Sequence, residues 1–154
     1  MIPRPNNRAE TLGAIYYMDL LLLTRHIGLL DKAGAHWTQE LIESPPVVLG
    51  DVVRNKVTQK AGVYVVRNDS ELVYIGKSVN LRTRICSQHL GPRKRSSTLR
   101  RKVSKHLQTD DEDQITEWLR TTTIGWIELG HHGLTLAVED YAIAKYNPPF
   151  NGYT

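Results

Sequence analysis

The sequence lacks the features that would place it among disulfide-stapled or membrane-spanning proteins. It contains one cysteine, Cys86, which excludes both a disulfide within the chain and a zinc site built from several cysteines. Its longest apolar stretch, Leu12 to Leu23, is about twelve residues long and includes Asp19, whereas a membrane-spanning helix needs about 20 apolar residues. The N-terminus has no apolar core of the kind found in secretion signals. We therefore expect a soluble, cytoplasmic protein.

Internal repeats and low-complexity runs are also lacking. The chain has 154 residues, of which 40% are hydrophobic. This is enough for the core of one ordinary domain, with room for an appendage.

Acidic residues are missing from a long stretch in the middle of the chain. From Arg82 to Lys105 lysines and arginines are frequent and aspartate and glutamate are absent, while acids gather between Asp110 and Asp113. The net charge is +4. A segregated basic belt is typical of proteins that bind a phosphate backbone. A solvated protein surface could have the same composition, so charge alone leaves both interpretations open.

Residues 1–58 are predicted to form an N-terminal helical extension. Apolar residues recur at three- and four-residue steps from Leu12 to Leu30, which is typical of an amphipathic helix, and Gly34 is expected to end it. A second short helix is predicted from Trp37 to Glu43, before two prolines. The segment from Val47 to Val57 is ambiguous between strand and helix.

No catalytic constellation is visible in this extension. We interpret His26 and His36 as structural residues, because neither has neighbours that would form a ligand set with it. The extension is either a surface for dimerisation or DNA recognition, or an additional helical layer over the core.

The next part of the chain predicts a β-hairpin followed by a helix. Two runs of β-forming residues, Val63–Val66 and Val73–Ile75, flank the polar segment Arg67–Glu71. Gly76 then interrupts the second strand, and Asn80 is a suitable N-cap for a helix.

The remaining segments complete a small α/β (α+β) domain over residues 59–154. Helical periodicity is present from Leu99 to Leu107 and from Leu134 to Tyr146, and a short helix is predicted from Ile115 to Arg120. Thr121 to Leu129 predicts a third strand. We expect a three-stranded antiparallel sheet flanked by helices.

The tyrosines of the hairpin occur in motifs that resemble those of a known enzyme family. Gly62-Val63-Tyr64 and Tyr74-Ile75-Gly76 are similar to the two motifs that name the GIY-YIG nucleases. Arg84 follows at the position of that family's helix arginine, and Glu139, with Asn151 in Pro-Pro-Phe-Asn, resembles its glutamate helix and terminal asparagine. The resemblance covers residues 60–152 and implies the GIY-YIG fold for them.

The resemblance also implies roles for these residues. Tyr64 would be the general base or orient the attacking water, and Tyr74 would contact the phosphate or share that role, with nearby cations favouring the phenolate. Arg84 stays charged and can hold phosphate oxygens, so we expect it to stabilise the transition state. Glu139 would bind Mg²⁺, with Mn²⁺ as a substitute, because Mg²⁺ needs few protein ligands. Asn151 would fix the site, and a capping role without chemistry is an equal alternative.

Further basic residues are predicted to bind the substrate. Lys77 follows the second motif directly and would be a second cation for the phosphate. The residues expected to contact the DNA backbone are Arg82, Arg93, Lys94, Arg95, Arg100, Arg101 and Lys105. Such contacts provide affinity and register rather than sequence choice.

One position departs from the family pattern. Relatives often have His or Tyr four residues after the helix arginine, where this chain has Gln88, and His89 follows one residue later. One residue of α-helix turns a side chain by about 100°, so His89 would serve as a proton shuttle only if the helix end is irregular, and we do not assign it this role. We interpret His131 and His132 as surface residues.

Together these patterns predict a metal-dependent DNA endonuclease that hydrolyses phosphodiester bonds. Its layout is most similar to the stand-alone restriction-type enzymes of the family. The alternatives are a homing- or repair-type nuclease, or a catalytically inactive DNA-binding module of the same fold. Because one site cuts one strand, a double-strand break would need a homodimer or two successive nicks.

Overall fold

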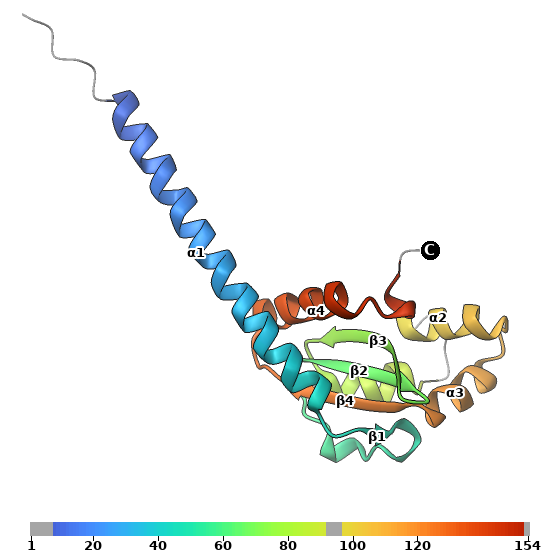
Figure 1. Ribbon diagram of the computed structural model, residues 1–154. Helices are drawn as coiled ribbons and strands as arrows, with labels where there is room; N and C mark the ends of the chain where they lie inside the picture. The colour runs from blue at the N-terminus through green and yellow to red at the C-terminus, as the bar shows by residue number, and fades with distance from the viewer. Residues whose placement is uncertain (1–7, 92–96, 153–154) are drawn as a thin grey trace, which may run out of the picture.

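The computed structural model describes residues 8–91 and 97–152, with side chains from Asp19 onward. An antiparallel sheet with helices on both faces forms the body of the molecule, and one long helix projects from it (Figure 1). Within these residues, none of the helices combines the length and apolar character needed to cross a bilayer. The predicted DNA contacts Arg93, Lys94 and Arg95 lie outside the described residues.

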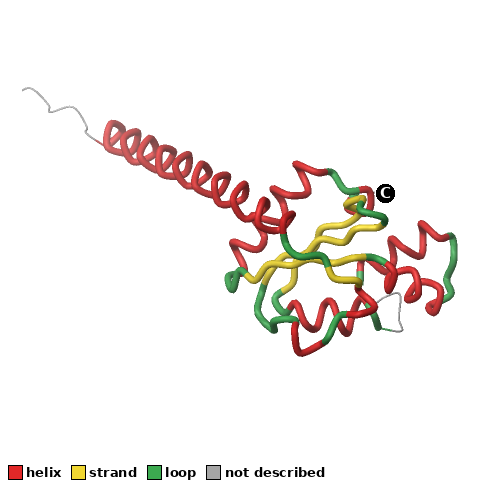
Figure 2. Tube along the Cα trace, turned by 60° about the horizontal axis from the view of Figure 1, so that its bottom comes forward, coloured by secondary structure: helices red, strands yellow, loops and turns green. Residues whose placement is uncertain are grey.

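The two helices predicted for the N-terminal extension are one continuous helix, α1 (Arg8–Glu43). The predicted break at Gly34 is wrong because this glycine is where α1 packs closely on α4 (His132–Tyr146). A Cβ at Gly34 would lie 2.9 Å from Cγ of Tyr141. The helix ends before Pro45 and Pro46 as predicted, and its N-terminal part points away from the body in both Figure 1 and Figure 2.

The sheet contains the three predicted strands and one more. Its order is β1-β4-β2-β3, with β1 at Val47–Val48, β2 at Gly62–Asn68, β3 at Glu71–Ser78 and β4 at Thr123–Glu128. The additional strand, β1, comes from the segment that the sequence left ambiguous, and it pairs with β4. Two short 3₁₀ turns, Leu49–Asp51 and Arg54–Lys56, lead from β1 towards β2.

The hairpin between β2 and β3 turns more tightly than predicted. Its two central residues, Asp69 and Ser70, have φ values of 48° and 70°. Positive φ at both central positions is the feature of type I′ turns, whose twist matches that of the flanking strands. The strands therefore extend to Asn68 and resume at Glu71.

Side chains alternate between the two faces of the sheet, as strand geometry requires. Val63, Val65 and Ile75 belong to the core cluster beneath α1 and α4. Tyr64 and Tyr74 belong to the cluster on the opposite face. That face is covered by three helices: η3 (Thr83–His89), α2 (Thr98–Leu107) and α3 (Glu112–Thr121).

The helix that follows the hairpin, η3, is a π-helix and not the regular helix that was expected. The predicted N-cap is present: the Asn80 side-chain oxygen accepts a hydrogen bond from the backbone N–H of Thr83 at 3.0 Å. Hydrogen bonds in a π-helix join residues five apart, so residues five apart lie on roughly the same side of the helix.

Candidate active site

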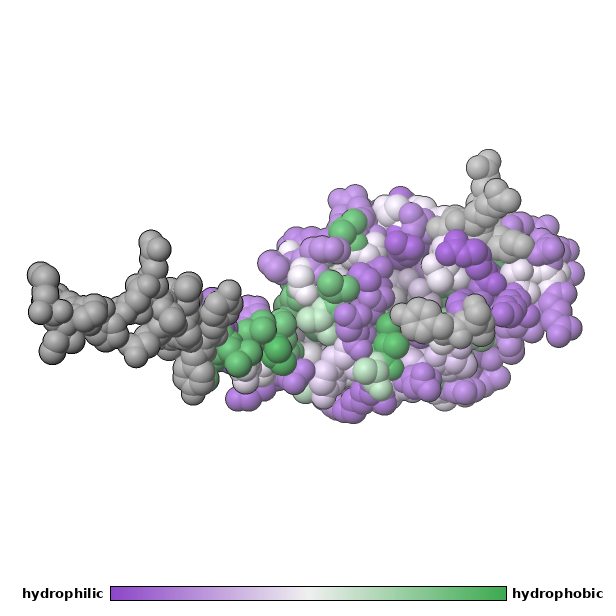
Figure 3. All heavy atoms as spheres, turned by 90° about the horizontal axis from the view of Figure 1, so that it is seen from above, coloured by the Kyte–Doolittle hydropathy of each residue, from purple (hydrophilic) through white to green (hydrophobic). Residues whose placement is uncertain are grey.

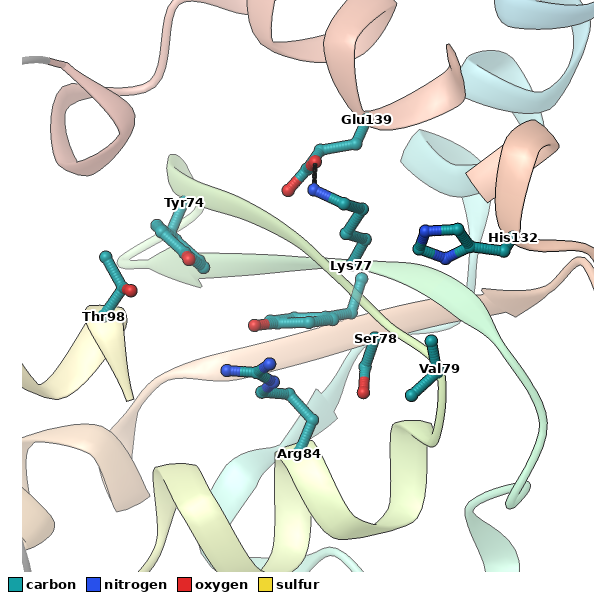
Figure 4. Close-up of a pocket in the computed structure, with 9 residues that line it drawn as sticks. Tyr74, Lys77, Ser78, Val79, Arg84, Thr98, His132 and Glu139 are labelled. Atoms are coloured by element: carbon teal, nitrogen blue, oxygen red, sulfur yellow. Dashed lines mark hydrogen bonds and ion pairs between the residues drawn. The ribbon is translucent and has the colours of Figure 1, made fainter. Parts of the chain in front are cut away.

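A pocket of about 300 Å³ opens at the edge of the sheet, beside β3 (Figure 4). Four of the five predicted catalytic residues line it: Tyr64, Tyr74, Arg84 and Glu139. The other lining residues are Lys77, Ser78, Val79, Thr98 and His132. The side chains come from five elements: β2, β3 with the residue that follows it, η3, α2 and α4.

The two tyrosines reach the pocket because of the register of the hairpin. Tyr64 is paired with Gly76 and Tyr74 with Val66, so both tyrosines lie on the same face. Their ring centroids are 6.1 Å apart. A Cβ at Gly76 would lie 2.4 Å from the hydroxyl oxygen of Tyr64, so glycine is required here to leave room for the ring.

Both phenols keep their protons at neutral pH. Burial raises the pKa of Tyr64 well above 10, and the neighbouring Tyr74 raises it further. Burial, followed by the Glu139 carboxylate, also raises the pKa of Tyr74. Arg84 acts in the opposite direction in both cases, but burial outweighs it. Arg84 thus favours the phenolate, as expected, but burial has the larger effect on both pKa values.

Arg84 extends from η3 towards the tyrosines (Figure 4). Its Nε–H is buried and has no hydrogen-bond acceptor among the described residues. A guanidinium that stays charged and lacks an acceptor for a buried donor is suited to bind an anion that enters the pocket.

His89, to which the sequence analysis assigned no role, lies next to this group. Its Nε2 is 2.6 Å from the Tyr64 hydroxyl oxygen. The π-helical geometry explains this contact, because His89 follows Arg84 by five residues and so returns to the same side of the helix. Burial, with the charges of Arg84 and Arg100, lowers the pKa of His89 to about 3, so the ring is neutral. Its Nδ1 has no partner within the described residues.

Glu139 and Lys77 form an ion pair across the pocket (Figure 4). Lys77 comes from β3 and Glu139 from α4, and the Glu139 side chain is 13% exposed. Within the described part of the chain no cluster of three or more His, Cys, Asp or Glu side chains could hold a metal ion. A single carboxylate at the wall of a pocket with room for water fits Mg²⁺, which usually keeps several water ligands and needs one or two carboxylates.

Asn151 does not line the pocket but holds one of its walls. Its Oδ1 accepts a hydrogen bond from the backbone N–H of Ile75, and its Nδ2 donates one to the carbonyl oxygen of the same residue, both at 2.8 Å. The side chain thus ties the 3₁₀ turn η5 (Pro149–Asn151) to the outer edge of β3, directly beside Tyr74. This favours the first of the two alternatives, in which the Asn151 amide fixes the site, over a capping role.

The predicted DNA contacts differ in position. Arg100 is fully buried, so its assignment as a DNA contact is wrong: it donates to the carbonyl oxygen of His89 at 2.8 Å and pairs with Glu112 at 2.8 Å. Half-buried Arg82 donates through Nε to the carbonyl oxygen of Val57 at 2.8 Å. Arg101 and Lys105 are exposed on α2, the helix that begins at the pocket with Thr98.

The two adjacent histidines also have different positions. His131 is the N-cap of α4, where its Nδ1 accepts a hydrogen bond from the backbone N–H of Leu134 at 3.3 Å. His132 is exposed, as expected, but it lines the pocket.

Known structures with a similar fold include the N-terminal GIY-YIG endonuclease domain of UvrC from Thermotoga maritima. The form bound to its catalytic divalent cation, magnesium, has a TM-score of 0.45 and 23% identity, over 64% of this chain and 91% of that one. A tyrosine-to-phenylalanine variant bound to the catalytic cation has a TM-score of 0.46 and 22% identity, over 65% and 91%. No curated protein matches the chain.

The family assignment comes from a comparison with models of protein families. Residues 50–153 match the model of the GIY-YIG catalytic domain. The match includes every residue that lines the pocket. It spans more than half of the sequence, so the chain belongs to the GIY-YIG nuclease family.

Proposed function

We propose that this protein is a Mg²⁺-dependent DNA endonuclease that hydrolyses phosphodiester bonds within the pocket beside β3. The observation that carries the proposal is the convergence of two phenols, a guanidinium and a carboxylate on one space of about 300 Å³. These groups meet three requirements of the reaction. The phenols offer a route for the proton of water, the guanidinium supplies positive charge for the phosphorane oxygens, and the carboxylate is a ligand for a cation at the leaving oxygen.

The attacking water is activated through Tyr64 and His89. Because Tyr64 keeps its proton, it can accept the proton of water only if its own proton leaves. The imidazole at 2.6 Å is positioned to accept it. Burial and two arginines make this ring a weak base in the free protein, and the negative charge of a bound phosphate would raise its pKa. In the concerted step the water proton passes to the Tyr64 oxygen and the Tyr64 proton to Nε2 of His89. The oxygen of water bonds to phosphorus while the bond to the leaving oxygen breaks.

Arg84 and Lys77 hold the phosphate during this step. The Nε–H of Arg84 has no acceptor among the described residues and would donate to a phosphate oxygen. When bound at Glu139, Mg²⁺ would supply a Lewis acid for the leaving oxygen. The Lys77 ammonium, which now pairs with Glu139, would then be available to the phosphate.

Within this class we favour a restriction-type enzyme acting on duplex DNA. Arg101 and Lys105 continue from the pocket along the exposed side of α2, and a phosphate backbone lying there would lead into the site. The α1 extension adds a surface outside the catalytic domain through which two sites can be paired, one for each strand.

A plasmid assay with one variant and one matched control tests the proposal. Glu139→Ala should abolish cutting and leave DNA binding largely intact, because it removes the carboxylate of the pocket. Glu128→Ala is the control. Glu128 is the nearest glutamate before Glu139 in the sequence, and it pairs at the surface with Lys60 instead of lining the pocket. Each protein is incubated with supercoiled plasmids, first with Mg²⁺ and then with EDTA.

Two results would count against the proposal. Equal cutting by wild type and Glu139→Ala would remove Glu139 from the mechanism. Binding without nicking over a broad panel of plasmids would favour a DNA-binding module that has the fold without the activity. If the wild type does cut, sequencing the fragment ends of a digested genome would identify its recognition site.

A further inference from the structure

The projecting part of α1 has an unusually apolar surface. Its large apolar side chains that are 40–60% exposed are Leu20, Leu21, Leu22, Leu23, Ile27, Leu29 and Leu30. They form the hydrophobic patch where the helix leaves the body of the molecule (Figure 3). Single exposed leucines are common on protein surfaces, but a contiguous apolar patch marks an interaction site.

Part of this patch belongs to a regular stripe along the helix. The stripe, with alternating steps of three and four residues, consists of Leu20, Leu23, Ile27, Leu30, Gly34, Trp37 and Leu41. This is the heptad spacing of helices that pack side by side. At its C-terminal end the stripe is covered, because Leu41 is fully buried and Gly34 lies against Tyr141 of α4. From Leu30 towards the N-terminus the same stripe continues at the surface.

A groove of about 380 Å³ lies where the covered part ends. Ile27, Leu30 and Asp31 of α1 form one wall, and Ala137, Asp140, Tyr141 and Ala144 of α4 form the other. The packing of α1 on α4 thus ends at an open, largely apolar groove, which is in line with the exposed stripe. A further helix lying along α1 would place its side chains in this groove.

We propose that a second copy of this chain covers the stripe from Leu20 to Leu30, so that two α1 helices pack together in a symmetric homodimer. Charge favours this occupant over DNA or a lipid surface. The charged residues beside the stripe and the groove, Asp19, Arg25, Asp31, Lys32 and Asp140, contain no excess of Lys or Arg. Both a phosphate backbone and an anionic membrane would select a surface rich in Lys and Arg instead.

The size of the helix also suits a dimer. From Arg8 to Ala33 it is about 39 Å long at a rise of 1.5 Å per residue, and its solvent-accessible diameter is about 13 Å. A partner helix that covers between a third and a half of this cylinder along its whole length removes roughly 500–800 Å² from water on each copy, of which the stripe from Leu20 to Leu30, about 17 Å long, accounts for roughly 220–340 Å². The groove beside α4 adds to this area, and about 800 Å² per partner is the size of a standard stable interface.

The functional consequence of the dimer depends on the nuclease proposal, but the interface does not. A two-fold symmetric contact brings together two identical pockets. The dimer would therefore cut both strands of a duplex in one encounter, whereas a monomer would produce single-strand nicks.

The test compares molar mass for the wild type and two variants of the full chain. The wild type should elute at about 35 kDa in size-exclusion chromatography with light scattering, twice the 17.5 kDa of one chain. Leu23→Gln combined with Ile27→Gln should give monomers, with the dissociation constant of the dimer raised at least about 100-fold. Val53→Gln is the control, because Val53 is 58% exposed but lies outside α1. It should remain dimeric.

Thermal unfolding followed by tryptophan fluorescence shows whether the body of each variant is folded. A monomeric wild type, a dimeric double variant, or a wild-type monomer that floats with anionic vesicles would each overturn the proposal. On plasmid DNA the wild type should yield linear product and the double variant nicked circles. If the masses are as expected and no protein cuts DNA, the dimer stands and the nuclease proposal fails.

Discussion

The buried histidine of the site should make the stability of the protein depend on pH in a defined window. In the folded chain the pKa of His89 is lowered from 6.5 to about 3, mainly by burial. The unfolded chain therefore binds more protons at this position between these two values. It follows that the free energy of unfolding decreases as the pH falls from 6.5 towards 3, and that His89 has little effect above 6.5.

The size of the effect follows from the shift. Each pH unit within the window changes the free energy of unfolding by about 1.4 kcal/mol for one histidine. Going from about pH 7.5 to about pH 4.5 should then cost roughly 3 kcal/mol. For a domain of this size the midpoint of thermal unfolding would fall by roughly 6–12 °C from this residue alone.

Urea unfolding of wild type and His89→Gln at the two pH values isolates this contribution. Glutamine leaves a polar group near the Tyr64 hydroxyl but cannot titrate, so the variant should lack the loss of roughly 3 kcal/mol. The free energy of unfolding of this variant at neutral pH will differ from that of the wild type, because the contact with Tyr64 changes. The comparison is therefore between the two pH values within each protein. His106→Gln replaces an exposed histidine and should behave like the wild type. If His89→Gln loses as much stability on acidification as the wild type does, the argument from burial is refuted.

Two further predictions concern residues that shape the pocket. Asn151→Ala removes both hydrogen bonds to Ile75 and should reduce the free energy of unfolding by about 1–3 kcal/mol, measured by urea denaturation; an unchanged value would contradict the clamp on β3. Gly76→Ala places a methyl group against Tyr64 and Tyr74, and should reduce the rate of DNA cutting at least about 100-fold with DNA binding retained. Cutting at the wild-type rate by this variant would show that the tyrosines need not lie where they do.

Much of the site could be predicted because its signals are local. Strand alternation places Tyr64 and Tyr74 on the same face once the hairpin is recognised, and both features depend on short stretches of sequence. The position of Glu139 followed from the family resemblance, and the structure brings it to the same pocket. The extent of α1 was not predictable in this way, because Gly34 ends a helix in isolation but here allows close packing on Tyr141.

The role of His89 was left unassigned and Arg100 was misjudged, because their environments depend on distant parts of the chain. The spacing of five residues between Arg84 and His89 has no meaning for a regular α-helix, and it becomes significant only in the π-helix. The end of that helix is held by Arg100, which donates to the carbonyl oxygen of His89 and also pairs with Glu112 of α3. In the sequence Arg100 is one more cation in a basic run, and only the packing of α2 against α3 shows that it is internal.

The amide of Asn151 has an effect beyond the pocket, because β3 is an edge strand. Edge strands present unpaired N–H and C=O groups to which another polypeptide can add. Asn151 occupies both groups of Ile75 in the middle of this edge, as a neighbouring strand would do. Asn151, which holds the wall of the pocket, therefore also prevents another polypeptide from pairing with the edge of β3, the step by which cross-β aggregates grow.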